Sequence, residues 1–171
     1  VTLLLPSATF QTETVTGTTL AAGATDQLIY KVRMTVANSS ITTAGFYFAV
    51  GGSFAAGDFE VSGFKLLEKV GTDDISTATL VTGAGVSYDP GAVVPTGDIV
   101  WQFANSFVAG DVVYYYITVD LSSAAVVNNT FNVTLDPSPL ENFVLDASPD
   151  KIDGGLVAGE VFTVSALDLV A

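Results

Sequence analysis

The chain has 171 residues, of which 49% are hydrophobic and only 13% are charged, and its formal net charge is −13. Its five basic residues form no patch that would attract nucleic acid or an anionic membrane surface, and no apolar run reaches the ~20 residues that span a bilayer. The absence of both Cys and His excludes disulfides, thiol nucleophiles and a Ser–His pair, and it leaves a catalytic zinc ion without its usual ligands.

The chain begins with an apolar segment, VTLLLP over residues 1–6. The segment lacks the positive region and the longer apolar stretch of a signal peptide, so we expect the chain to start after such a peptide has been removed, or at a trimmed end. In one interpretation residues 1–7 are a donor strand that completes a sheet of the next subunit, so that the interface contains Val1, Leu3, Leu4 and Leu5. In the other they are the first strand of the chain's own sandwich.

The energetics of this segment bear on both interpretations. Burial of three such apolar side chains gives roughly 5–8 kcal/mol, at about 1.5–3 kcal/mol each. Association of two proteins costs an estimated ~4–15 kcal/mol. The free energy gained by burying the segment would therefore roughly equal the cost of association, and a stable fibre would need flanking contacts as well.

Period-two alternation of Val, Ile, Phe, Tyr and Thr follows and predicts strands. In residues 28–36, Leu28 and every second residue after it would share one face. Residues 46–50 form a Phe-rich strand. A further run starts at residue 59, and Gly63 within it predicts a bulge or bend.

The second half of the chain continues the same pattern. Residues 74–78 are the best place for an isolated helical turn, and residues 99–103 form a short strand with Trp101 in the core. The remaining strands are expected at residues 112–119, 131–135 and 161–170. With turns marked by Gly, Asn and Asp-Pro, about eight to ten strands predict an all-β fold, an antiparallel two-sheet β-sandwich that is Ig-like or jelly-roll-like, as a single domain over residues 8–171.

A set of strand and turn features carries a resemblance over roughly residues 20–135. A capped first strand precedes the Phe-rich strand, and an Ala-x-Asp step follows. An Ala-Thr-x-Leu element comes next, and an Ala-Gly turn then precedes an aromatic strand that ends in Asp. These features occur here as Leu20-Ala21-Ala22-Gly23, Ala56-Gly57-Asp58, Ala78-Thr79-Leu80, Ala109-Gly110 and Asp120. In these features the chain resembles a β-sandwich repeat module of secreted bacterial surface proteins and, less closely, donor-strand fibre subunits similar to biofilm-matrix filament proteins. The resemblance implies a secreted β-sandwich, with any assembly device in residues 1–19 or 136–171.

Three consecutive tyrosines, Tyr114, Tyr115 and Tyr116, place two rings on one face of a strand and one on the other. Exposed rings could stack on sugars or pack at interfaces. Alternatively, the outer rings cover a neighbouring strand or loop.

Acidic loops suggest a calcium site, because Ca²⁺ prefers several oxygen ligands from a flexible loop. Asp146, Asp150 and Asp153 form the best cluster, and their spacing does not match an EF-hand loop. The alternative is that these carboxylates are simply solvated. No other cofactor is expected.

Asn-x-Ser/Thr sequences that would accept a glycan occur at Asn38, Asn128 and Asn132. Asn38 and Asn128 lie in predicted turns and are the candidate glycosylation sites. Asn132 would qualify only on an outward strand face.

A soluble chain with so little charge must hide apolar surface, and copies of the chain can provide the cover. We therefore expect a structural subunit of an extracellular filament or surface layer, a homopolymer of identical subunits, outside the cell or on its surface. The alternative is an adhesin or carbohydrate-binding module of a larger secreted protein, with a glycan ligand. Nothing in the placement of the carboxylates selects a glycosidase pair, so we do not expect an enzyme.

Overall fold

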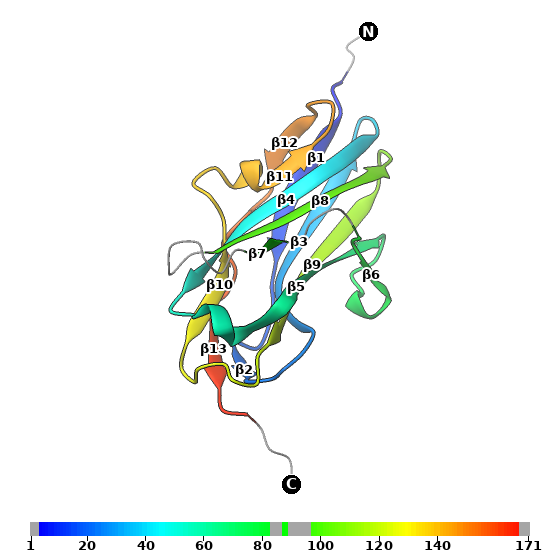
Figure 1. Cartoon of the computed structure of the whole chain (residues 1–171). Helices are drawn as coiled ribbons and strands as arrows, with labels where there is room; N and C mark the ends of the chain where they lie inside the picture. The colour runs from blue at the N-terminus through cyan, green and yellow to red at the C-terminus, as the bar shows by residue number, and fades with distance from the viewer. Residues whose placement is uncertain (1–3, 83–86, 89–96, 168–171) are drawn as a thin grey trace.

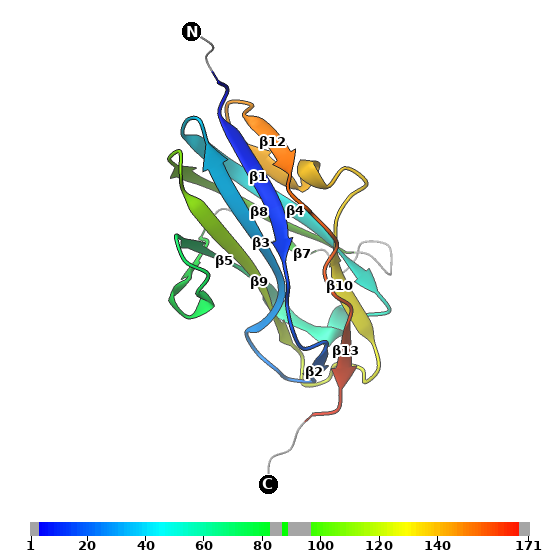
Figure 2. The same cartoon turned by 180° about the vertical axis from the view of Figure 1, so that it is seen from behind.

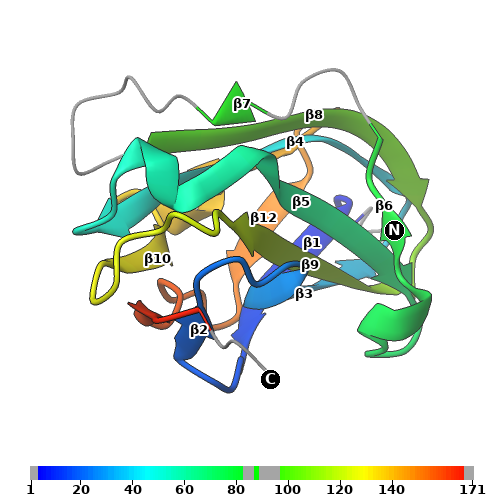
Figure 3. The ribbon, with the colours of Figure 1, turned by 60° about the horizontal axis from the view of Figure 1, so that its bottom comes forward.

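A computed structural model of the chain describes residues 4–82, 87–88 and 97–167. Within them the chain forms thirteen strands and three short 3₁₀ turns, which make two sheets packed face to face (Figure 1). Seen from its lower end, the molecule shows the two layers one above the other (Figure 3). The predicted all-β sandwich is confirmed, with more and shorter strands than the eight to ten expected.

The first sheet, called sheet A, has the strand order β12-β1-β3-β9-β5-β6 and faces the viewer in Figure 2. Its strands are β1 (Ser7–Glu13), β3 (Gln27–Ala37), β5 (Phe59–Val70), β6 (Thr79–Leu80), β9 (Val112–Leu121) and β12 (Asp150–Asp153).

The second sheet, sheet B, has the order β2-β13-β10-β4-β8-β7, with β11 also paired to β4, and it faces the viewer in Figure 1. Its strands are β2 (Thr19–Ala21), β4 (Ile41–Gly52), β7 (Ser87–Tyr88), β8 (Gly97–Phe107), β10 (Thr130–Thr134), β11 (Phe143–Leu145) and β13 (Phe162–Ser165). The turns are η1 (Ala56–Asp58), η2 (Ile75–Thr77) and η3 (Pro139–Asn142).

Two strand pairs are parallel, which departs from the purely antiparallel sheets expected. β12 pairs with β1, and β13 pairs with β2, so two strands from the end of the chain lie beside two from its beginning. Parallel neighbours need a long connection, and here the connection is most of the domain. β1 starts at one end of the sandwich and β13 ends at the opposite end (Figures 1 and 2).

The core between the sheets is built around aromatic rings. Phe46 on β4 is fully buried and packs edge to face against four other rings, with centroid distances of 4.6–6.3 Å; these are Phe48, Phe103, Tyr115 and Phe143. Across the layers, Phe10 of β1 stacks on Phe143 of β11 with centroids 4.2 Å apart. Trp101 is only 2% exposed, as predicted for a core residue.

Bulges modify the predicted alternation in two strands. In β3 the register shifts between Leu28 and Tyr30, so Ile29 is buried where Leu28 was expected, while the predicted face is correct from Tyr30 onward. In β5 the register shifts between Phe59 and Phe64, and Val61 in the bulge is 96% exposed. This shift confirms the bulge predicted at Gly63, where a Cβ would lie only 2.8 Å from a carbonyl oxygen of β9.

The helical turn expected in residues 74–78 is present as η2. Asp74 caps it by accepting a hydrogen bond from the backbone N–H of Ser76 at 3.0 Å. In the part of the chain that the structure describes, no helix has the length and hydrophobicity needed to cross a membrane.

Candidate functional site

The N-terminal segment leads directly into the sandwich. Of the predicted interface residues, Val1 and Leu3 lie outside the described residues, whereas Leu4 and Leu5 are 65% and 60% exposed. The carbonyl oxygen of Leu5 accepts a hydrogen bond from the Asn38 side chain at 2.9 Å. Two apolar side chains are thus presented to solvent immediately before the first strand.

The first strand itself is paired on both sides within its own chain. From Ser7 to Glu13 it pairs with β3, and from Ser7 to Phe10 it also pairs with β12. Ala8 and Phe10 are fully buried. The first-strand interpretation therefore describes residues 7–13, and the donor-strand interpretation stays a prediction for the residues before them.

Strand β8 of sheet B lacks a second partner among the described strands over most of its length. Only Ile99 and Val100 of β8 pair with β7, and residues 101–107 pair with no described strand other than β4. This stretch reads WQFANSF and contains no charge. Uncharged open edges can pair with an added strand, and proteins often guard them with an inward-pointing charged side chain. No residue of this stretch is charged, so the strand itself lacks such a guard; Glu68 of β5, on the other sheet, accepts a hydrogen bond from the Asn105 side chain at 2.8 Å.

The three tyrosines of β9 divide between the two faces of sheet A. Tyr115 points into the core and is fully buried. Tyr116 points outward, yet it is only 1% exposed and donates a hydrogen bond to Asp73 at 3.0 Å, while Lys31 forms an ion pair with the same carboxylate at 2.7 Å. Burial and the bond to Asp73 raise the pKa of the Tyr116 phenol far above its usual range. Tyr116 therefore covers a loop, as one interpretation predicted, and only Tyr114 keeps accessible outer surface.

The predicted calcium ligands are not assembled into a cluster. Among the described residues, which include all three, no group of three or more acidic side chains lies close enough to hold a metal ion. Asp153 accepts hydrogen bonds from the backbone N–H groups of Leu156 at 2.7 Å and Gly155 at 2.8 Å, and these bonds lower the pKa of its carboxyl group. Asp150 lies on β12 opposite Ser7, and Asp146 lies in the turn before that strand.

Both candidate glycosylation sites are exposed and lie in turns, as expected. Asn38 and Asn128 have left-handed backbone conformations, with φ of 71° and 72°. Asn132 points outward from β10 but is half-buried. Glycan attachment at these positions stays a prediction.

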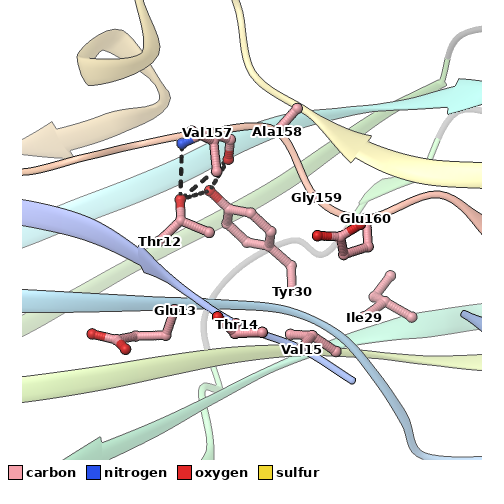
Figure 4. Close-up of a pocket in the computed structure, with 10 residues that line it drawn as sticks. All are labelled: Thr12, Glu13, Thr14, Val15, Ile29, Tyr30, Val157, Ala158, Gly159 and Glu160. Carbon is pink, nitrogen blue, oxygen red and sulfur yellow. Dashed lines mark hydrogen bonds between the residues drawn. The ribbon is translucent and has the colours of Figure 1, made fainter. Parts of the chain in front are cut away.

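A small cavity of about 100 Å³ lies between the end of β1 and residues 157–160 (Figure 4). The Tyr30 ring reaches into it, and its hydroxyl donates to the carbonyl oxygen of Val157 at 3.0 Å and lies 2.9 Å from the Thr12 hydroxyl. The Thr12 hydroxyl in turn accepts a hydrogen bond from the backbone N–H of Val157. These bonds tie the segment before β13 to sheet A, which indicates a structural role for Tyr30.

The phenol of Tyr30 makes stability sensitive to alkaline pH. Burial raises the pKa of Tyr30 to about 12. In the unfolded chain a tyrosine ionises near pH 10, so between about pH 10 and 12 the unfolded state binds fewer protons, and the free energy of unfolding falls by about 1.4 kcal/mol per pH unit on account of this residue. Tyr30→Phe is expected to lose about 1–2 kcal/mol below pH 10, because the Val157 carbonyl loses one of the two donors that it has among the described residues and keeps the Thr12 hydroxyl at 3.1 Å.

The measurement is urea unfolding of the wild type and Tyr30→Phe at a series of alkaline pH values. The difference between the two proteins should shrink above pH 10, because the variant lacks the titrating phenol. Tyr47→Phe, a substitution of an outward-facing tyrosine, is the control. A constant difference across the whole range would contradict the expectation.

A groove of about 390 Å³ lies on the outer face of sheet B. Tyr47 and Ala49 of β4 and Val100 of β8 line it, together with three carboxylates, Asp98, Asp136 and Glu141. Asp98 and Asp136 are exposed, and Glu141 has an ion pair with Lys151 at 3.6 Å. The alternation in β4 places Tyr47 outward, but no sequence pattern connects the three acids, which come from β8, the loop after β10 and η3.

No family model matches the chain, and no curated protein matches it. Among solved structures, one that is similar is AvmM, which catalyses macrocyclization in alchivemycin A biosynthesis; it is 13% identical over 92% of this chain and 87% of its own, with a TM-score of 0.43. Another is a chain of the complex of CaDoc0917 with CaCohA2, 14% identical over 94% of this chain and 99% of its own, with a TM-score of 0.32. At such identities and TM-scores, neither similarity assigns an activity or a partner to this chain.

Proposed function

We propose that this chain is a structural subunit of an extracellular filament or surface layer, which polymerises through strand contacts between identical copies. In this proposal the residues before β1 add a strand to a neighbouring copy, and the chain has no catalytic role. It acts outside the cell or on its surface after a signal peptide has been removed.

The observation that carries the proposal is the exposed apolar segment ahead of a fully paired first strand. Leu4 and Leu5 are mostly uncovered in their own sandwich, being 65% and 60% exposed, whereas residues 7–10 of β1 pair with a strand on both sides. The uncharged edge of β8 over residues 101–107 supplies a surface of matching chemistry. Strand addition would join the main chains by hydrogen bonds and bury the leucines.

The groove beside Tyr47 favours a second candidate function, a carbohydrate-binding or adhesin module. An aromatic ring next to several hydrogen-bonding carboxylates is a common lining for a sugar site. A glycan array tests this candidate directly. Binding that is lost in Tyr47→Ala and kept in Tyr114→Ala would support it, and an array without any binding would count against it.

The test of the filament proposal uses the full chain with Leu4→Asp and Leu5→Asp combined. Both side chains are exposed, so the fold should be kept, while a charged segment cannot be buried against a neighbour without a large desolvation cost. We expect filaments of the wild type in electron microscopy and a monomer of the double variant in sedimentation velocity. Deletion of residues 1–5 should have the same effect.

The matched control combines Val61→Asp with Val161→Asp. These valines are 96% and 54% exposed and lie outside the N-terminal segment, so the control adds the same charge and removes comparable apolar surface. It should assemble like the wild type. Filaments formed equally well by the Leu4→Asp, Leu5→Asp variant would rule out the strand-donation part of the proposal.

A further inference from the structure

The basic residues of this acidic chain are concentrated on one face. Four of the five lie on β3 and β5 at positions that alternate with core residues, so they point outward from sheet A; they are Lys31, Arg33, Lys65 and Lys69. The strands of sheet B contain no Lys or Arg at all. The cations therefore lie on the sheet A side, although three of the four form ion pairs with nearby carboxylates: Lys31 with Asp73, Arg33 with Glu13, and Lys65 with Asp26 and Asp120.

Part of the sheet A face forms a row across three adjacent strands. Arg33 of β3 and Lys69 of β5 are the cross-strand neighbours of Tyr114 on β9, one on each side. We call these three residues the Arg33–Tyr114–Lys69 row. Arg33 is paired with Glu13 at 3.2 Å, whereas Lys69 forms no ion pair with any described residue. The row thus keeps a cation without a direct ion pair beside an accessible aromatic ring. Hydrogen bonds from Ser76 and, to a smaller extent, the charge of Lys69 lower the pKa of the Asp74 carboxyl group.

The groove on sheet B has the complementary character. Its three carboxylates surround Tyr47, and Asp98 and Asp136 have no ion pair with a described residue. A lysine that enters this groove would meet carboxylates and the face of a tyrosine ring, which are the two kinds of group that attract an ammonium ion.

We propose that the groove on sheet B of one copy binds the Arg33–Tyr114–Lys69 row on sheet A of a second copy. Charge complementarity carries the choice of occupant, because a chain of net charge −13 repels its own copies except where cations are concentrated. The two surfaces lie on opposite sides of the sandwich, so the contact is heterologous and can repeat from copy to copy without closing.

The contact presupposes the homopolymer proposed above and adds the flanking surface that the N-terminal segment needs. That segment alone about breaks even against the cost of association, estimated at ~4–15 kcal/mol. The contact between the broad faces of two sandwiches uses no residue of the N-terminal segment. The two contacts can therefore be disrupted separately.

The test uses single charge reversals in the full chain, Lys69→Glu and Asp98→Lys, and their combination. Both side chains lie on outer faces away from the core, so the fold is expected to be kept. Each single reversal should raise the critical concentration for assembly by about tenfold or more, because it places like charges opposite each other. The double variant should recover much of the loss, because the pair is restored with inverted signs. Glu160→Lys, an exposed site with the same charge change as Asp98→Lys, is the matched control.

A carbodiimide cross-link between Lys69 and Asp98, Asp136 or Glu141 gives an independent readout. A mixture of isotope-labelled and unlabelled chains shows by mass spectrometry whether the link joins two copies. We expect this intermolecular link in the wild type and, at high protein concentration, in the Leu4→Asp, Leu5→Asp variant as well.

The outcomes separate the two contacts. Wild-type filaments without the cross-link, in which the reversals leave the critical concentration unchanged, would overturn the face contact and leave strand addition standing. If the cross-link forms and the Leu4→Asp, Leu5→Asp variant assembles normally, strand addition is overturned and the face contact stands. A wild type that stays monomeric and unlinked at every concentration would overturn both. If Lys69→Glu assembles normally but loses binding to alginate, the row binds an acidic glycan and the contact between copies is overturned.

Discussion

Replacement of Asp58 by Ala is expected to lower the free energy of unfolding by about 3–5 kcal/mol, because three donors lose the buried carboxylate that accepts their hydrogen bonds. Asp58 ends η1 and is only 1% exposed. Its carboxylate accepts hydrogen bonds at 2.7 Å from the backbone N–H groups of Ala55 and Val126 and from the side chain of Asn129. One side chain therefore holds the turn before β5 against the loop between β9 and β10.

Urea unfolding of the full chain measures this effect. Asp58→Asn should recover little of the loss. Its amide keeps one acceptor oxygen, but its NH2 group, a donor, takes the place of the second carboxylate oxygen and faces groups that are also donors. Glu60→Ala removes an exposed carboxylate two residues away and should change the free energy of unfolding by less than about 0.5 kcal/mol. A midpoint for Asp58→Ala equal to that of Glu60→Ala would show that the carboxylate contributes nothing to the fold.

Truncation of Phe46 to Ala should cost about 3–5 kcal/mol, because the cavity it leaves cannot be refilled by rings that are already packed. Phe46 is fully buried and contacts rings from β4, β8, β9 and β11. The substitution therefore weakens both sheets at once. Phe46→Leu should cost much less, because it keeps most of the volume.

The neighbouring residue on the same strand gives the control for this prediction. Tyr47→Ala removes a ring of similar size that points outward and is half-buried, so it should cost clearly less than Phe46→Ala. The comparison is made by thermal and urea unfolding. Equal losses at the two positions would mean that the core is not centred where the structure places it.

The sequence predicts the fold well wherever contacts are local. Alternation in β3 from Tyr30 onward, the Phe-rich strand at residues 46–50, the burial of Trp101, the bulge at Gly63 and the helical turn at residues 74–78 all follow from spacing and backbone preferences. The parallel pairings of β12 and β13 do not, because each strand is four residues long and its partner lies at the far end of the chain.

The structure also explains why two Asp residues belong to the pattern shared with the secreted repeat module. Two Asp residues of that pattern are structural: Asp58 is the buried acceptor described above, and Asp120 accepts a hydrogen bond from the backbone N–H of Asp26 and pairs with Lys65 at 2.8 Å. Such features belong to the scaffold, so they predict the sandwich without predicting a ligand.

The proposed contact surfaces were only partly visible in the sequence. The apolar N-terminal segment stands out by composition alone. The Arg33–Tyr114–Lys69 row needs the cross-strand register, and the groove needs three acids from separate elements. No local pattern contains that information, because register is set by turns and bulges along the whole sheet.

The placement of the first and last strands has a mechanical consequence. When a single chain is pulled by its two ends, tension enters through the start of β1 and leaves through the end of β13, at opposite ends of the sandwich. Such a load acts along these strands and across their hydrogen bonds, which run perpendicular to the strand axis. The bonds from β1 to β3 and β12 must then yield together in shear, so a pulled subunit resists stretching far better than one whose end strand could be peeled away bond by bond.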